Sequence, residues 1–281
     1  MGLENLKVLA EGLDHPEGVT VDPTGVLYAG GEAGQIYRVD VRSGGVEQVA
    51  TTGGFMLGLC ADASGLLYCC DVGRKEVVRI DPHTGDVTVY SNGTPDRPMV
   101  NPNWPVFDDT GNLYVTDSGS WKQNDGCILR IDAGGKTSLW TAEATGFPNG
   151  AALSADGESL FVLESTTPAL VRIPIRADGS AGPREVVTNL VGVPDGCAID
   201  TEGRVYVFYY RPDRIDRVSP DGRVEILAED PEGTLLAAPT NGVWLAPERR
   251  RLVVGSLGRW HLTECDFNAT GIPLRYPKVE A

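Results

Sequence analysis

The sequence predicts an all-β protein that folds as a six-bladed β-propeller. Six stretches of the chain share one pattern: a lead residue (in most copies polar and followed by Gly), a short apolar run, and a turn with Asp, Gly or Pro. The lead residues are at positions 17, 57, 103, 149, 195 and 241, so the spacing is 40 once and then 46 four times. A repeat of this length is typical of an array of similar supersecondary units.

Each repeat has room for four short strands. The first strand follows the lead residue, and a turn rich in Asp, Gly and Pro joins it to the second. A third strand carries Arg before an apolar residue, as at Arg38, and a Gly-containing turn precedes a fourth strand, as in residues 43–49. The second strands are expected at residues 26–28, 66–68, 113–115, 160–162, 205–207 and 252–254. Four short strands in each of six repeats, separated by frequent turns, predict a six-bladed propeller.

The ring is expected to close with a strand from the opposite end of the chain. The sixth repeat ends after its third strand, near residues 264–266. Residues 6–10 form an apolar segment that precedes the first repeat and belongs to none of the others. We therefore assign this N-terminal strand as the fourth strand of the last blade, and expect residues 1–281 to form one domain.

Composition excludes several functional classes. The chain has 281 residues and a formal net charge of −15, with its acidic residues scattered rather than clustered. Such a surface repels nucleic acid and anionic membranes. No secretory leader and no membrane-spanning apolar run is evident in the sequence. We expect a cytoplasmic protein, a monomer or weak oligomer, whose partner is a small-molecule substrate.

The lead residues of the repeats are candidates for a functional site. In a propeller the first strand of every blade lines the central channel, so equivalent positions lie at one height around one axis. Asn-Gly and Asp-Gly are also strong hairpin signals, but each repeat already has its hairpin turn about eight residues later. The predicted ring of side chains, with Leu57 as its one apolar gap, comprises Glu17, Asn103, Asn149, Asp195 and Asn241.

Carboxylates that face each other in a channel favour a bound cation. Like charges at close range force one carboxylate either to take up a proton or to recruit a positive ion. Carboxylate and amide oxygens are hard donors. The ring therefore predicts one divalent cation, Ca²⁺ in the first place, with zinc, manganese, magnesium or iron as alternatives.

The chain resembles the SMP-30/gluconolactonase/LRE family, which includes regucalcin and bacterial sugar lactonases. The resemblance covers the whole chain and rests on Glu17-Gly18, Asn103, Pro148-Asn149-Gly150 and Pro194-Asp195-Gly196. It implies a six-bladed propeller that hydrolyses a lactone and holds one divalent cation with Glu17, Asn149 and Asp195. It also implies that Asn103 lies beside the cation. In such a site Asp195 would be the general base that activates water.

The substrate pocket departs from the family pattern. The family's Arg two residues before the third-blade Asn is replaced here by Asn101, and Trp104 follows that Asn. Aromatic and apolar residues are also frequent in the loops near the site. A sugar lactone and a more apolar lactone or ester are both compatible with this lining. The predicted substrate-binding residues are Asn103, Asn101, Trp104, Trp121, His15 and Asn241.

Two functions from other classes compete with lactone hydrolysis. One is a non-catalytic propeller similar to NHL modules, which would have no need to converge acids and amides in its channel. The other is an enzyme similar to strictosidine synthase, which shares the propeller but lacks this set of cation ligands. Three further acids, Asp71, Asp117 and Glu164, follow second strands. We expect them to bind backbone amides or a neighbouring Arg and to be structural.

Overall fold

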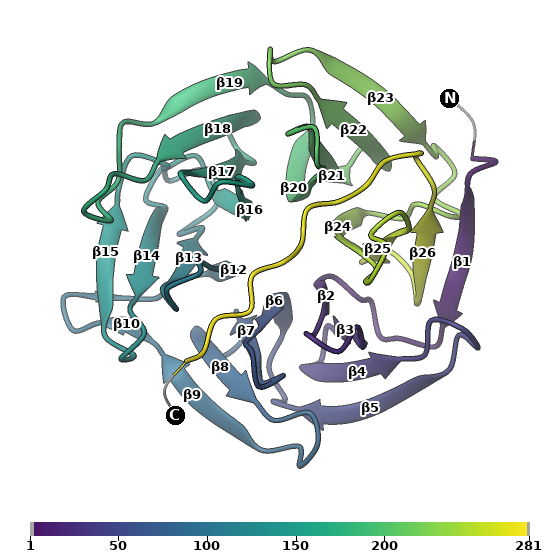
Figure 1. Ribbon diagram of the computed structural model, residues 1–281, viewed down its shortest axis with the longest axis horizontal. Coiled ribbons are helices and arrows are strands. Elements are labelled where there is room, and N and C mark those ends of the chain that lie inside the picture. The colour runs from purple at the N-terminus through teal and green to yellow at the C-terminus, as the bar shows by residue number, and fades with distance from the viewer. Residues whose placement is uncertain (1–2, 280–281) are drawn as a thin grey trace.

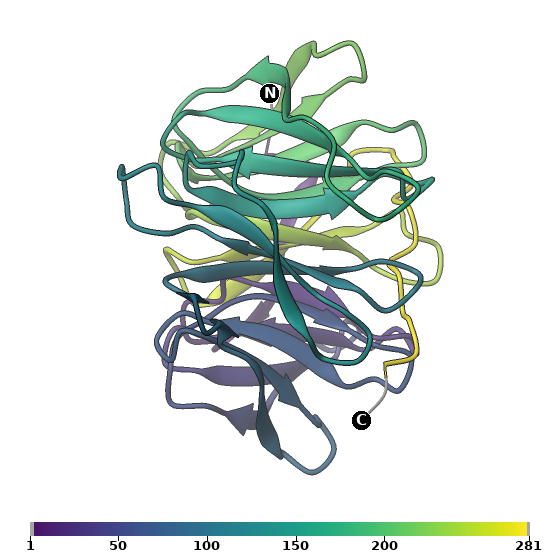
Figure 2. The same ribbon diagram turned by 90° about the vertical axis from the view of Figure 1, so that its left-hand side faces the viewer.

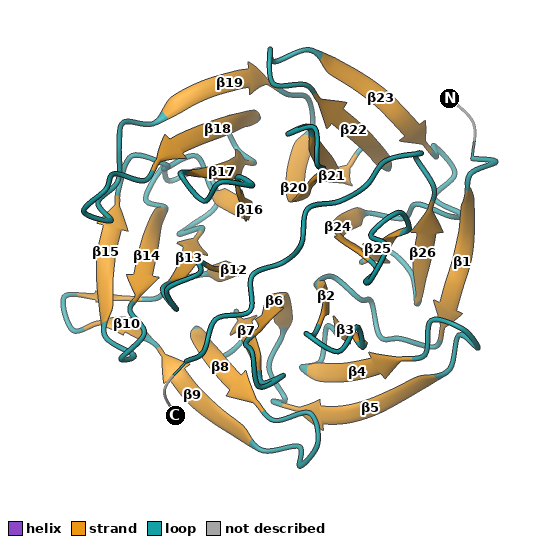
Figure 3. Ribbon diagram, in the orientation of Figure 1, coloured by secondary structure: helices purple, strands orange, loops and turns teal. Residues whose placement is uncertain are grey.

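Six four-stranded antiparallel sheets, the blades, are arranged in a ring around a central channel (Figure 1). The computed structural model describes residues 3–279. Strands and loops make up this part of the chain, and it contains no helix long and apolar enough to cross a membrane (Figure 3). The predicted six-bladed all-β propeller is confirmed.

The first three blades follow one another along the chain. Blade 1 consists of β2 (Val19–Val21), β3 (Leu27–Gly30), β4 (Gln35–Val39) and β5 (Val46–Thr51). Blade 2 consists of β6 (Met56–Ala61), β7 (Leu67–Asp71), β8 (Glu76–Ile80) and β9 (Val87–Ser91). A small hairpin of β10 (Gly93–Thr94) and β11 (Arg97–Pro98) leads to blade 3, which consists of β12 (Pro102–Phe107), β13 (Leu113–Asp117), β14 (Cys127–Ile131) and β15 (Thr137–Thr141).

The last three blades repeat this order, and the sixth takes one strand from the N-terminus. Blade 4 consists of β16 (Pro148–Leu153), β17 (Ser159–Glu164), β18 (Ala169–Pro174) and β19 (Glu185–Asn189). Blade 5 consists of β20 (Val193–Ile199), β21 (Val205–Arg211), β22 (Arg214–Val218) and β23 (Val224–Glu229). Blade 6 consists of β24 (Pro239–Trp244), β25 (Leu252–Ser256), β26 (His261–Cys265) and β1 (Leu6–Glu11).

The N-terminal strand closes the ring as the sequence predicted. β1 pairs antiparallel with β26, from Leu6 opposite Cys265 to Glu11 opposite His261. Segments from the two ends of the chain are therefore hydrogen-bonded within one sheet, and β1 takes the place of β26 as the outer strand of blade 6.

The hairpin turns of the repeats are held by their own aspartates. Asp22 Oδ1 accepts hydrogen bonds from the backbone amides of Thr24 and Val26, and Gly25 has a φ of 86°, which an L side chain rarely adopts. Asp62 and Asp200 make the same turn and also accept a hydrogen bond from the hydroxyl of a buried tyrosine on the second strand. The recurrent Asp thus stabilises the turn, and in blades 2 and 5 it also accepts the hydrogen bond of a buried tyrosine hydroxyl.

The acids after the second strands are structural, as expected. Asp117 accepts hydrogen bonds from the backbone amides of Val100 and Asn101, and Asp71 accepts one from the amide of Phe55. Glu164 accepts from the amide of Gly146 and pairs with Arg184. In each case the carboxylate fixes the loop that enters the innermost strand of its own blade.

The C-terminal segment, for which the sequence predicted no element, crosses one face of the ring. We call residues 267–279 the C-terminal strap. It passes over the centre of the ring in Figure 1 and lies along one side of the molecule in Figure 2. Gly271 forms an antiparallel bridge with Asp200, and the amide of Ile272 donates to the carbonyl of Ile199 at 3.1 Å.

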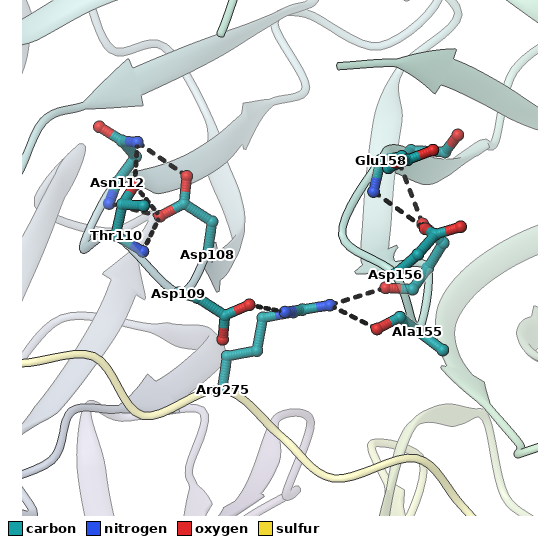
Figure 4. Close-up of polar contacts among 10 residues, drawn as sticks. Asp108, Asp109, Thr110, Asn112, Ala155, Asp156, Glu158 and Arg275 are labelled. Carbon is teal, nitrogen blue, oxygen red and sulfur yellow. Dashed lines mark hydrogen bonds and ion pairs between the residues drawn. The ribbon is translucent and has the colours of Figure 1, made fainter. Parts of the chain in front are cut away.

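The C-terminal strap is hydrogen-bonded to every blade. Arg275 connects blades 3 and 4, because its guanidinium pairs with Asp109 and donates to the carbonyls of Ser154 and Ala155 (Figure 4). The hydroxyl of Tyr276 donates to the carbonyl of Val21 in blade 1. In blades 2 and 5 the amides of Ala63 and Thr201 donate to the carbonyls of Pro277 and Thr270 in the strap. In blade 6 the carbonyl of Arg249 accepts from the amide of Gly271 in the strap.

Candidate active site

The channel opens into a cavity of about 900 Å³ on the face opposite the C-terminal strap. The first residues of the innermost strands and the loops before them supply its polar floor, and the surrounding loops supply most of an apolar wall. Near the C-terminal strap lies a smaller cavity of about 100 Å³, lined mostly by apolar side chains of all six innermost strands and by residues 272–276. The larger cavity holds most of the residues that the sequence singled out.

The structure brings four of the five predicted polar lead residues to this cavity. Glu17, Asn103, Asn149 and Asp195 all line it and are buried, with 4–7% of each residue exposed. Leu57 lines it as well, as the apolar gap in the ring. These residues therefore share one location, whereas their roles as ligands or as a base stay predictions.

In five of the six blades an irregularity at the start of the innermost strand takes the lead residue out of the regular ladder. The pairing of β16 with β17 skips from Pro148 to Ala151, and that of β20 with β21 skips from Pro194 to Cys197. The inner strands of blades 2, 3 and 6 are irregular at the equivalent point. A bulge leaves residues out of the ladder and redirects their side chains.

The glycines after the lead residues allow neighbouring innermost strands to pack closely. A Cβ atom on Gly150 would lie 2.4 Å from the Cα of Gly196, and one on Gly196 would lie 2.3 Å from the carbonyl oxygen of Thr240. A Cβ on Gly18 would lie 2.1 Å from the carbonyl oxygen of Leu57. Gly150 and Gly196 lie within strands. The Asn-Gly and Asp-Gly dipeptides at these two positions are therefore packing features and not hairpin turns.

Hydroxyl groups from neighbouring strands hold the backbone of the lead residues. Thr116 Oγ1 donates to the carbonyl of Asn149 at 2.7 Å, and Ser118 Oγ donates to the carbonyl of Pro148 at 2.7 Å. Ser165 Oγ donates to the carbonyl of Pro194 at 2.6 Å and accepts from Asn149 Nδ2 at 3.2 Å. That last bond orients the Asn149 amide with its oxygen away from Ser165.

The sequence analysis missed these hydroxyl contacts, although a signal for two of them was present. Asp117-Ser118 and Glu164-Ser165 are acid-serine pairs at equivalent ends of β13 and β17. The first pair lies in blade 3, next to the blade of Asn149, and the second lies in blade 4, next to the blade of Asp195. The acid fixes the loop of its own blade, and the serine fixes the loop of the next one.

The two carboxylates of the cavity have raised pKa values. Burial raises the pKa of Asp195 to about 8, while its hydrogen bond with Asn149 acts in the opposite direction. The pKa of Glu17 is raised well above its usual value, first by burial and then by the negative charges of Asp195 and Glu32. Two buried acids that oppose each other's ionisation are a favourable environment for a cation.

The amide oxygens of the cavity are compatible with the same ion. The buried Oδ1 atoms of Asn101, Asn103 and Asn149 have no hydrogen-bond partner within residues 3–279. A buried polar atom without a partner costs free energy, so a set of such atoms around one cavity calls for an occupant. Two carboxylates and the amide oxygens that line the same cavity are the kind of donor that hard divalent cations prefer. The residues present therefore fit a divalent cation.

Two predicted site residues lie elsewhere and correct the sequence analysis. Asn241 does not border the larger cavity, because its Oδ1 accepts from the amide of Gly242 and its Nδ2 donates to the carbonyl of Val19. Trp104 lines the smaller cavity and packs over Gly58. The bulge in β12 turns Asn103 toward the site and the next side chain away from it.

The other predicted residues, His15, Asn101 and Trp121, do line the larger cavity. His15 Nδ1 lies 2.9 Å from Asp14 Oδ1 and 3.3 Å from Glu32 Oε2. The hydrogen bond from His15 is the main cause of a lowered pKa for Asp14, followed by that from Gln35. Because these three side chains contact one another, we assign the cluster a structural role at the mouth of the cavity.

Comparison with known proteins identifies the family. The model of the SMP-30/Gluconolactonase/LRE-like region matches residues 15–258, a span that contains every polar lead residue. The chain belongs to the SMP-30/gluconolactonase/LRE-like family. A 6-deoxy-6-sulfogluconolactonase of Pseudomonas putida is 25% identical over 257 residues, which cover 84% of this chain and 83% of that protein.

Solved structures share the fold of this chain. A putative gluconolactonase superposes with a TM-score of 0.81 at 19% identity, over 96% of this chain and 94% of that one. A calcium-binding protein, regucalcin, from Agrobacterium tumefaciens superposes with a TM-score of 0.78 at 20% identity, over 98% and 97% of the two chains. At this level of identity the likeness to the SMP-30-like structures establishes the fold alone.

Proposed function

We propose that this chain is a divalent-cation-dependent lactonase. The observation that carries the proposal is that two buried carboxylates, Glu17 and Asp195, line one cavity together with the unpartnered amide oxygens of Asn103 and Asn149. Membership of the SMP-30/gluconolactonase/LRE-like family and the relative that acts on a gluconolactone support it. Glu17, Asn149 and Asp195 would hold the cation, and the calcium-binding regucalcin favours Ca²⁺.

The reaction would consume one water molecule and open the lactone ring. A divalent cation in such a site polarises an ester carbonyl and makes nearby water more acidic. Asp195 would accept a proton from the attacking water as the new bond to the carbonyl carbon forms. The ring C–O bond then breaks, the alkoxide oxygen takes up a proton, and a hydroxy acid is released.

Chelation of divalent ions should lower both lactone hydrolysis and thermal stability. An ion that binds only the folded ring stabilises it by about 2.7 kcal/mol at a free concentration of 100 Kd. For a chain of this size that corresponds to a melting shift of about 5–10 °C. The measurement is a lactone panel and a melting curve of the chelator-treated protein, before and after Ca²⁺, Mg²⁺, Mn²⁺ or Zn²⁺ is restored. Unchanged melting and activity after chelation would contradict the cation site.

Asn103→Ala should impair substrate use more than cation binding. Asn103 lines the cavity, but we place it beside the cation and not among its three main ligands. We expect an increase in KM of about tenfold, which corresponds to about 1.4 kcal/mol of lost interaction, with a smaller change in cation affinity measured by calorimetry. A loss of cation affinity as large as that of Glu17→Gln would instead make Asn103 a ligand.

A further inference from the structure

The exposed aromatic side chains of this protein gather at the mouth of the larger cavity. Among the aromatic residues in the described part of the chain, Trp260, Trp121 and Tyr210 are the most exposed, at 58%, 46% and 44%. Trp121 and Tyr210 line the cavity. The ring of Trp260 packs edge-on against His15, another lining residue, with centroids 5.4 Å apart. We call these three residues the aromatic rim.

The aromatic rim is continuous with an apolar wall inside the cavity. Trp121 packs edge-to-face on Phe147 at a centroid distance of 4.9 Å. Phe55, Val72 and Leu257 extend this surface. Single exposed apolar residues are ordinary, but a clustered apolar surface around a concave site marks the place where an apolar ligand binds.

The loop that carries Trp121 is held in place. The amide of Ser120 donates to Asp125 Oδ1 at 2.7 Å, and Arg97 donates to the carbonyl of Asp125 at 2.7 Å. Phe147, the partner of Trp121, has a φ of 59°, a backbone conformation that a non-glycine residue seldom adopts. The aromatic surface is therefore arranged before any ligand arrives, which lowers the entropic cost of binding.

The cavity lining offers an anionic substrate little positive charge beyond the proposed cation. Glu17, Glu32 and Asp195 line it, and the two charges of the cation would balance only those of Glu17 and Asp195. Arg211 also lines the cavity, but its guanidinium pairs with Asp213 and lies 5.4 Å from the centre of the Tyr210 ring. A polyhydroxylated sugar lactone would place hydroxyl groups against apolar side chains that cannot hydrogen-bond with them.

We propose, on the basis of the lactonase function above, that the substrate is an uncharged lactone with an aromatic or branched aliphatic substituent. The lactone ring would lie at the polar floor near Glu17 and Asp195. The substituent would contact the apolar wall and the aromatic rim. Trp121 and Tyr210 are then specificity-determining residues, because they contact the substituent and not the reacting ester.

The test compares three substrates that share a six-membered lactone ring. These are δ-valerolactone, a phenyl-substituted δ-lactone and glucono-1,5-lactone. We expect kcat/KM to be highest for the phenyl lactone, by about tenfold or more over δ-valerolactone, because a stacked aromatic group adds on the order of one kcal/mol or more. Trp121→Ala and Tyr210→Ala should each reduce this preference several-fold. Leu139→Ala, at an equally exposed residue on the outer strand β15, should leave it unchanged.

The outcomes separate this inference from the proposed function. If δ-valerolactone is hydrolysed but glucono-1,5-lactone is preferred, or if Trp121→Ala leaves the preference intact, the inference is wrong and the lactonase function stands. If no lactone is hydrolysed, the lactonase function fails. Calorimetric titration with a lactam that carries the same phenyl substituent then tests ligand binding at the aromatic rim directly. Binding that Trp121→Ala weakens about tenfold supports the apolar ligand class, and binding that is absent or unaffected overturns it.

Discussion

Replacing Asp195 by Asn should lower lactone turnover by a factor of about 10² or more, even at saturating divalent cation. The substitution keeps the shape of the side chain and one oxygen donor, but it removes a charge and the proposed base. Positioned general bases contribute roughly 10²–10⁴ to a rate. Asp195 is buried at the cavity floor, and Asn149 beside it is held by Ser165. The introduced amide group would therefore occupy the same place without accepting a proton.

The measurement is kcat at increasing cation concentration, with cation affinity determined separately by calorimetry. Asp117→Asn is the matched control, since it removes one buried carboxylate that bonds to backbone amides and lies outside the cavity lining. It should reduce stability while cation affinity stays the same. If Asp195→Asn reaches normal turnover once the cation is restored, Asp195 is only a ligand, and His15 is the next candidate for the base.

Deleting residues 267–281 should lower the melting temperature by about 10 °C. The C-terminal strap makes hydrogen bonds to all six blades and covers the smaller, apolar cavity with Ile272 and Tyr276. Burial of an apolar side chain contributes about 1.5–3 kcal/mol, and a net hydrogen bond about 1 kcal/mol. Even with partial compensation the loss is about 3–5 kcal/mol, and each kcal/mol is about 2–4 °C at this size.

Milder variants separate this effect from a failure to fold. Tyr276→Phe removes only the hydrogen bond to Val21, and Arg275→Gln removes the contacts of the C-terminal strap with Asp109, Ser154 and Ala155. Each should lower the melting temperature by a few degrees, since a net hydrogen bond contributes about 1 kcal/mol and an exposed ion pair about 1 kcal/mol or less. Lactone turnover at low temperature should change much less, because the C-terminal strap is on the face opposite the larger cavity. A truncated protein that melts within about 2 °C of the full chain would show that β1 and β26 alone secure the ring.

The amino-acid sequence by itself determined the number of blades, the order of their strands and the closure of blade 6 by residues 6–10. It also located Glu17, Asn103, Asn149 and Asp195 as positions that meet at one cavity. These features are local or repeated: the same Asp-Gly turn and the same apolar strands recur at a fixed spacing. Each recurrence pairs with its neighbour in the same way, so one periodicity specifies the whole ring.

Only the tertiary structure decided the features that break this periodicity. The direction of the Trp104 and Asn241 side chains depends on a bulge and on hydrogen bonds to a neighbouring strand. The need for Gly150 arises from the approach of Gly196 in the next blade. The C-terminal strap has no repeat, and its partners, such as Val21 and Asp109, are more than 150 residues away in the chain. Contacts of this kind are set by the packing of distant segments, and no local pattern of residues encodes them.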